Sequence, residues 1–270
     1  MKLGILRTDT VRPEWAVDFG QYPDMFVRLL SKADPSMDFV TYDVEGGQYP
    51  DDIDEVDAYL ITGSKSSVYD DKPWIPPLID FVQKIAARNK KIIGICFGHQ
   101  LVAQALGGKT EKSDKGWGAG LHTHTFSEIP SWHDGGDADL DILVSHQDQV
   151  VENATGARVL ASNSFCENAV CQIGEQILTF QGHPEFIPEY SRAIMEFRRE
   201  LFGEEVYHYQ KFLLDSLART GVVGLTSIQG GMTRGVLEAT MTQSIDETVS
   251  PLQEALFEIE KFMKQYSIEE

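Results

Sequence analysis

The stretch KIIGICFGHQ, residues 91–100, decides the fold. A run of apolar, mostly β-branched residues leads to Cys96, with Gly94 before the thiol and Gly98 after it. Such a run favours a buried strand, and residues 99–106, closed by two glycines, favour a helix. A strand that passes directly into a helix needs a sharp reversal, which small residues on either side permit. The sequence therefore predicts a strand–turn–helix unit with a thiol at its apex.

This unit has the pattern of a nucleophile elbow with cysteine in place of serine. The thiol would stand above the sheet at the first turn of the helix. Free N–H groups there stabilise a thiolate and, later, an oxyanion. The alternative is an ordinary core cysteine in a strand-to-helix turn.

A thiolate nucleophile needs a base, and the segment FQGHPE, residues 180–185, offers one. His183 and Glu185 follow a predicted strand at a spacing of two, so in extended backbone they project to the same side. The carboxylate can then hold the orientation and the tautomer of the imidazole. Pro184 keeps residue 183 extended. On its own this motif is weak, because a strand-end histidine paired for structural reasons has the same pattern.

Short apolar runs alternate with helical patterns in the first part of the chain, which indicates βαβ units and a parallel sheet with helices on both faces. The predicted strands are Lys2–Arg7, Asp38–Asp43, Ala58–Ile61 and Lys91–Cys96, and the predicted helices are Tyr22–Lys32 and Pro77–Arg88. In the middle of the chain, closely spaced strands are predicted at Gly120–Phe126, Leu140–Ser145, Arg158–Ala161, Ala169–Gln172 and Gln176–Gln181.

After about residue 202 the pattern becomes helical. Tyr207–Arg219 and Pro251–Gln265 are amphipathic, and a connector rich in Gly, Thr and Ser, Thr220–Thr233, separates them. We therefore expect a domain over residues 1–205 and a helical C-terminal extension over residues 206–270. We expect the stripe of the last helix to cover its own domain or a second copy of the chain.

Composition limits the partners. The formal net charge of −19 opposes binding to nucleic acid and to anionic membranes, and no apolar run approaches the roughly 20 residues that span a bilayer. A small-molecule substrate is the expected partner. The cysteines are few and odd in number, Cys96, Cys166 and Cys171, which favours a reducing cytoplasm over a disulfide framework.

Together the two motifs resemble the class I glutamine amidotransferase family, in a branch similar to GMP synthase. The family pattern G-x-C-x-G-x-Q is matched from Gly94 to Gln100, and its later H-P-E is matched at residues 183–185. The resemblance spans roughly residues 1–200. It implies a flavodoxin-like, doubly wound sheet and hydrolysis of a γ-glutamyl amide, with Cys96 as nucleophile, His183 as base and Glu185 orienting it.

The resemblance also assigns the rest of the site. Phe97 and Ser64, or its neighbour Gly63, would hold the oxyanion with backbone N–H groups, although the family loop tends to read Gly-Gly-Pro where this chain has Gly63-Ser64-Lys65. Gln100 matches the substrate-binding glutamine. The segment SHQDQV, residues 145–150, places His146 and Gln147 at the substrate cleft.

Three functions remain open at this stage: a free-standing γ-glutamyl hydrolase, a glutaminase subunit that passes ammonia to a separate synthetase, and a non-catalytic binding module. A homo-oligomer is also possible. We expect no cofactor and no metal. His122 and His124 alternate on a strand and His133 is near, but no further ligand completes the spacing. We interpret Cys166 and Cys171 as buried thiols and Trp117 as packing rather than a substrate platform. His99, in the helix beside the nucleophile, either packs or supports the residues that contact the substrate.

Overall fold

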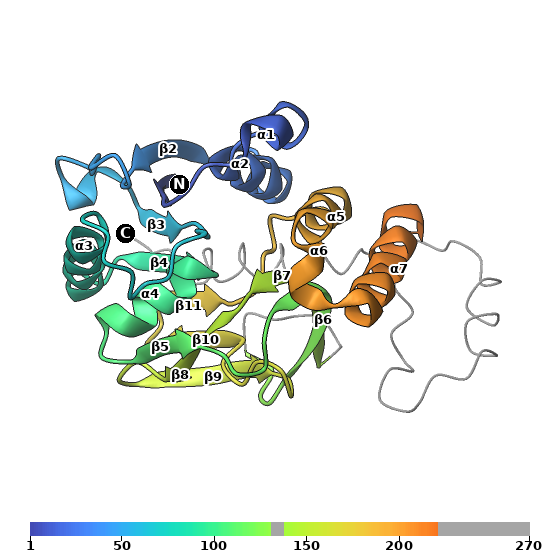
Figure 1. Ribbon diagram of the computed structural model, residues 1–270. Coiled ribbons are helices and arrows are strands. Elements are labelled where there is room, and N and C mark those ends of the chain that lie inside the picture. Colours follow the sequence, from blue (N-terminus) through green and yellow to red (C-terminus); the bar gives the residue numbers. More distant parts are fainter. Residues whose placement is uncertain (131–137, 221–270) are drawn as a thin grey trace.

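The computed structural model describes residues 1–130 and 138–220, and its centre is a nine-stranded sheet (Figure 1). The strand order is β2-β1-β3-β4-β11-β10-β9-β6-β7. Strands from β2 to β11 run parallel, and the pairings from β11 to β7 are antiparallel. The strands are β1 Lys2–Arg7, β2 Asp38–Asp43, β3 Ala58–Ile61, β4 Lys91–Ile95, β6 Gly118–Phe126, β7 Asp139–His146, β9 Ala157–Ser162, β10 Val170–Ile173 and β11 Ile177–Phe180.

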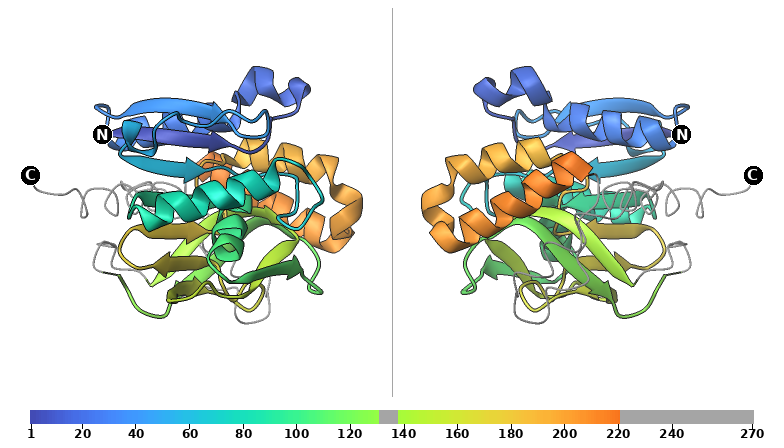
Figure 2. Two further views of the ribbon diagram at one scale, coloured as in Figure 1. Left: turned by 90° about the vertical axis from the view of Figure 1, so that its left-hand side faces the viewer. Right: turned by 90° about the vertical axis from the view of Figure 1, so that its right-hand side faces the viewer.

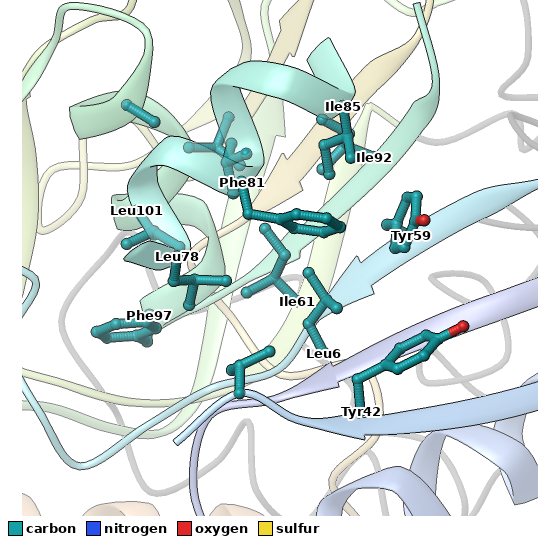
Figure 3. Packing of buried hydrophobic residues seen from close by; sticks show 14 of the residues in the cluster. Leu6, Tyr42, Tyr59, Ile61, Leu78, Phe81, Ile85, Ile92, Phe97 and Leu101 are labelled. Carbon is teal, nitrogen blue, oxygen red and sulfur yellow. The ribbon is translucent and has the colours of Figure 1, made fainter. Parts of the chain in front are cut away.

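Helices cover both faces of the parallel strands, which confirms the predicted fold class. On one face, α3 (Ile75–Ala87) and α4 (Phe97–Ala105) pack on the sheet. Figure 3 shows Leu78 and Phe81 of α3 lying against side chains of the strands. On the other face, α2 (Tyr22–Ala33) buries Phe26 and Leu30 against strand residues that include the apolar side chains of β1. Burial of this kind is the main stabilising contribution to such a layered fold.

A third apolar cluster joins the last described helices to the antiparallel strands. α5 (Pro188–Phe197) and α7 (Glu204–Thr220) lie side by side over β6 and β7, with the short α6 (Arg199–Phe202) between them in the chain (Figure 2). Gln210 of α7 accepts a hydrogen bond from the N–H of Leu121 at 2.8 Å and donates to its carbonyl at 3.3 Å. This helix is thus fastened to the backbone of β6.

The antiparallel part of the sheet reaches back to the end of β11. The N–H of His183 donates to the carbonyl of Leu143 on β7 at 2.8 Å. A Cβ on Gly182 would lie 2.8 Å from the Ile142 side chain, so only glycine allows this approach. The segment after β11 is therefore held against β7, beside the carboxyl ends of the parallel strands, where α/β folds place their sites.

Several elements were not predicted. The strands β5 (Lys109–Lys112) and β8 (Asp148–Glu152) form a separate two-stranded sheet and are mostly polar, so they lack an apolar run. The short α1 (Pro13–Phe19) buries no residue fully. The helix α5 carries Tyr190 and Ile194 four residues apart, a signal that was available.

Some predictions lie outside the described residues: the helix Pro251–Gln265, the connector beyond Thr220, and His133. The division into residues 1–205 and 206–270 stays a prediction. Among the described helices, none has the length and apolar composition needed to cross a membrane.

Candidate active site

Cys96 stands between β4 and α4 in a backbone conformation that side chains rarely adopt. Its φ is 52° and its ψ is −100°, which costs on the order of 1–3 kcal/mol. The glycines two positions before and after Cys96 are required because backbone atoms pack closely against them. A Cβ on Gly94 would lie 2.7 Å from the carbonyl oxygen of Gly98, and one on Gly98 would lie 2.4 Å from that of Ile61. The predicted elbow is therefore present, and its crowding explains both glycines.

His183 and Glu185 form a buried pair. The imidazole Nδ1 lies 2.8 Å from a carboxylate oxygen of Glu185. Both residues are 4% exposed. Burial lowers the pKa of His183, but the Glu185 carboxylate and, after it, Cys96 outweigh burial and raise that pKa to about 10. On its other side, the imidazole stacks on Phe186, with ring centroids 3.9 Å apart. The ring is thus fixed in position and holds a proton at neutral pH.

The loop after β3 passes close to both groups. A Cβ on Gly63 would lie 2.8 Å from Cε1 of His183 and 3.6 Å from Cβ of Cys96. Within residues 1–130 and 138–220, no acceptor is found for the N–H of Ser64 or for that of Phe97. Two unused donors near a thiol are what an oxyanion hole requires.

Residues from the end of β1 hold this loop in place. The Thr8 hydroxyl donates to the carbonyl of Gly63 at 2.9 Å. The buried carboxylate of Asp9 accepts from the backbone N–H of Lys65 at 2.8 Å and from its Nζ at 2.6 Å. A proline at position 65, as in the usual family loop, has no N–H to donate. In this chain the Asp9–Lys65 contact fixes the loop instead.

A cavity of about 160 Å³ opens at this point. It is lined by seven of the nine predicted site residues, Gly63, Ser64, Cys96, Gln100, His146, Gln147 and His183. The other two lie behind it: Glu185 is packed against His183, and Phe97 is buried at the start of α4.

The predicted substrate residues differ in what they offer. The amide nitrogen of Gln100 donates to the carbonyl of Asp148 at 2.9 Å and to Gln181 at 3.1 Å. Its carbonyl oxygen is therefore the group left for a ligand. His146 is buried, which lowers its pKa to about 3, and its Nδ1 bonds the same Asp148 carbonyl at 3.1 Å. The imidazole of His146 thus shapes the turn from β7 to β8 rather than carrying charge.

Sequence reasoning missed three groups that line the cavity. Trp117, expected only to pack, does line it, and the guanidinium of Arg198 lies 4.7 Å from the centroid of its ring. The Asp148 carboxylate is bound by the hydroxyls of Ser67 and Tyr69. Arg198 follows α5 and carries no motif that would have marked it.

The two other cysteines, and the histidines on α4 and β6, are buried or half-buried in the fold. Burial raises the pKa of Cys166 and that of Cys171 to about 12, as expected of thiols in a core. His99 is buried with its Nδ1 at 2.7 Å from the Thr179 hydroxyl. Burial lowers the pKa of His122 and that of His124 to about 3. In the described parts of the chain, no three His, Cys, Asp or Glu side chains are grouped so as to hold a metal ion.

The fold and the elbow define a class of α/β proteins with a cysteine at the carboxyl edge of a parallel sheet. The family model for class I glutamine amidotransferases matches residues 15–199. The chain belongs to the class I glutamine amidotransferase family.

Named relatives agree with this membership. γ-Glutamyl peptidase 4 of Arabidopsis thaliana is 35% identical over 175 residues, which is 62% of this chain and 69% of that protein. A glutamine amidotransferase-like protein of Schizosaccharomyces pombe is 34% identical over 77% of this chain and 88% of its own length. Among solved structures, a glutamine amidotransferase from Methylobacillus flagellatus superposes with a TM-score of 0.69 at 20% identity, covering 100% of this chain and 96% of the other. That last likeness supports the fold alone.

Proposed function

We propose that the protein hydrolyses γ-glutamyl amide bonds through a covalent glutamyl-thioester on Cys96. The observation that carries this proposal is a shared cavity. Cys96, held at the elbow with φ 52°, lines the same cavity as His183, whose imidazole is bound by the buried Glu185 at 2.8 Å. A nucleophile, a base and a group that orients the base are the parts that acyl transfer needs.

In the first half-reaction, the sulfur of Cys96 attacks the γ-carbonyl carbon of the substrate. The sulfur attacks as a thiolate, because its proton already resides on His183, and the Glu185 carboxylate stabilises this imidazolium. The N–H groups of Phe97 and Ser64 would bind the oxyanion of the tetrahedral intermediate. Removing one such donor typically costs about 3 kcal/mol of transition-state stabilisation. His183 then protonates the leaving amine, and the thioester remains.

In the second half-reaction, water attacks the thioester carbonyl while His183 accepts its proton. The tetrahedral intermediate collapses, the thiol is restored and glutamate leaves. The carbonyl oxygen of Gln100 is suited to accept a hydrogen bond from the α-ammonium group of the glutamyl moiety, because its amide nitrogen is already occupied. No cofactor is needed for these steps.

Among γ-glutamyl compounds, we propose γ-glutamyl peptides as the substrate. The relatives named γ-glutamyl peptidase 4 and γ-glutamyl peptidase 3 of Arabidopsis thaliana are each 35% identical to this chain. A glutaminase subunit that serves a separate synthetase stays the alternative. We also propose a cytoplasmic location, which is supported by the free thiols of Cys96, Cys166 and Cys171.

The test is glutamate release by the purified protein from γ-glutamyl-glycine and from glutamine, measured with the wild type, Cys96→Ala and Cys171→Ala. We expect turnover of the dipeptide, a loss on the order of 10⁴-fold or more in Cys96→Ala, and little change in Cys171→Ala. Equal activity of Cys96→Ala and the wild type would refute the mechanism. Release from glutamine alone, and only when a cell extract supplies a partner, would favour the synthetase subunit.

A further inference from the structure

Arg198 is a cation in the cavity without a carboxylate partner among the described residues. Two other cationic side chains line the cavity and both have a carboxylate partner: Lys65 pairs with Asp9 at 2.6 Å, and His183 pairs with Glu185 at 2.8 Å. The neighbouring Arg199 is paired with Glu204 at 2.7 Å and does not line the cavity. Arg198 instead donates to the Ser145 hydroxyl at 3.0 Å. In a chain with a net charge of −19, a half-buried arginine that pairs with none of the described carboxylates calls for an explanation.

The surroundings of Arg198 leave its donors available. The guanidinium carbon lies over the Trp117 ring, 4.7 Å from its centroid, a cation–π contact that pairs no N–H group with an oxygen acceptor. Arginine carries five N–H donors, and the contact with Ser145 uses one nitrogen. A planar fork of this kind matches a carboxylate with two parallel hydrogen bonds.

The position of Arg198 indicates which part of the substrate it meets. The leaving amine must lie on the side of His183, which protonates it. His183 stacks on Phe186, and the chain continues from there into α5, whose Ile194 also lines the cavity, and then to Arg198. Gln100 belongs to α4, which packs on β3, β4 and β11, whereas α5 packs on β6 and β7 (Figure 1). Arg198 therefore enters the cavity from the segment that begins at His183 and Phe186, whereas Gln100 enters it from α4.

We propose that Arg198, held by Trp117 and Ser145, binds a carboxylate of the leaving group and so selects γ-glutamyl-α-amino acids over glutamine and over γ-glutamyl amines. The inference rests on the proposed function, since it assumes that the amine leaves on the side of His183. Glutamine releases ammonia, which has no carboxylate, so Arg198 would gain nothing from that substrate.

The experiment compares γ-glutamyl-glycine with γ-glutamyl-ethylamide, in which a methyl group replaces the carboxylate of the leaving group. The measured quantity is the ratio of kcat/KM for the two compounds. We expect Arg198→Met to reduce this ratio by about 10- to 100-fold, as the loss of a charge-assisted pair would. Arg198→Lys should give an intermediate ratio, because lysine keeps the charge without the fork. Arg199→Met is the matched control and should leave the ratio at the wild-type value.

A ratio that Arg198→Met leaves unchanged would overturn the proposal, and so would an equal loss for both substrates, which would assign Arg198 to the α-carboxylate of the glutamyl moiety. Binding separates this result from a failure of the proposed function. Calorimetric titration of Cys96→Ala should show tighter binding of γ-glutamyl-glycine than of the ethylamide, and the difference should vanish in Cys96→Ala/Arg198→Met. If the wild type hydrolyses neither compound while Cys96→Ala still binds γ-glutamyl-glycine more tightly, the proposed function is contradicted and the role of Arg198 is supported. Equal binding of both compounds to Cys96→Ala would contradict the role of Arg198.

Discussion

The imidazole of His183 lies 2.8 Å from the Glu185 carboxylate, and both side chains are buried. Burial alone would discharge this histidine, and the adjacent carboxylate is the main reason that its pKa is instead raised to about 10. The Glu185 carboxylate therefore sets the protonation state of His183 as well as its orientation. The raised pKa determines the pH range over which the imidazolium can protonate a leaving amine.

Glu185→Gln should move the alkaline limb of kcat/KM to lower pH. The wild-type imidazolium persists until the pH approaches the raised pKa, so activity should be retained on the alkaline side. Burial lowers the pKa of His183, and the Glu185 carboxylate is the largest effect that raises it. Removing the carboxylate charge therefore lowers this pKa. We expect a shift of more than about one pH unit, measured from the pH dependence of glutamate release.

The same variant should be less impaired than His183→Ala at neutral pH. An amide still bonds the imidazole but stabilises the imidazolium poorly, whereas His183→Ala removes the base, at a cost of about 10²- to 10⁴-fold. Equal losses in Glu185→Gln and His183→Ala would mean that Glu185 does more than orient and stabilise its partner.

Asp9→Ala should lower kcat by about 10- to 100-fold, because it releases the loop that carries the N–H of Ser64. Its carboxylate holds Lys65 by both the backbone N–H and Nζ. Asp9→Asn should lose less, since it keeps an acceptor. Asp54→Asn is a suitable control. Asp54 also pairs with a lysine, Lys90, at 2.9 Å, but it lies before β3, at the opposite end of the strand. Equal kinetic effects of Asp9→Ala and Asp54→Asn would contradict a specific role of Asp9.

Two glycine substitutions should have different outcomes. Gly63→Ala places a methyl group against the His183 ring, so we expect at least a tenfold loss of kcat with a near-normal melting temperature.

Gly98→Ala drives a methyl group into the Ile61 carbonyl oxygen at 2.4 Å, a backbone atom that cannot move alone. It should destabilise the protein by about 2 kcal/mol or more, measured by urea unfolding. Full activity in Gly63→Ala would show that His183 is not seated as described.

Gln210→Ala should lower the free energy of unfolding by about 2 kcal/mol, because it leaves the buried N–H and carbonyl of Leu121 without their partner. Lys211→Ala is the control on the same helix. Its ion pair with Asp215, at 2.8 Å, is half-exposed and should contribute less than about 0.5 kcal/mol. Similar unfolding curves for Gln210→Ala and Lys211→Ala would show that α7 contributes little to the fold.

The sequence predicted the elements that follow from local patterns. Lys2–Arg7, Asp38–Asp43 and Ala58–Ile61 appear with the predicted bounds, because short apolar strands between helices have a clear signal. The elbow glycines and the spacing of His183 and Glu185 likewise constrain their own neighbourhood. Asp9 and Arg198 depend on contacts across the fold. Asp9 reaches a loop 56 positions away in the chain, and Arg198 meets Ser145 53 positions away. No local pattern encodes either contact.

The central claim is that Cys96 is the nucleophile, and covalent labelling tests it most directly. The protein is treated with a glutamine-like diazo ketone, and the labelled peptides are mapped by mass spectrometry while hydrolysis is followed in parallel. We predict one label per chain, on Cys96, with activity lost in proportion, because burial raises the pKa of Cys166 and that of Cys171 to about 12 and makes them poor nucleophiles. A label found mainly on Cys166 or Cys171, or hydrolysis that continues after Cys96 is fully labelled, would contradict this account.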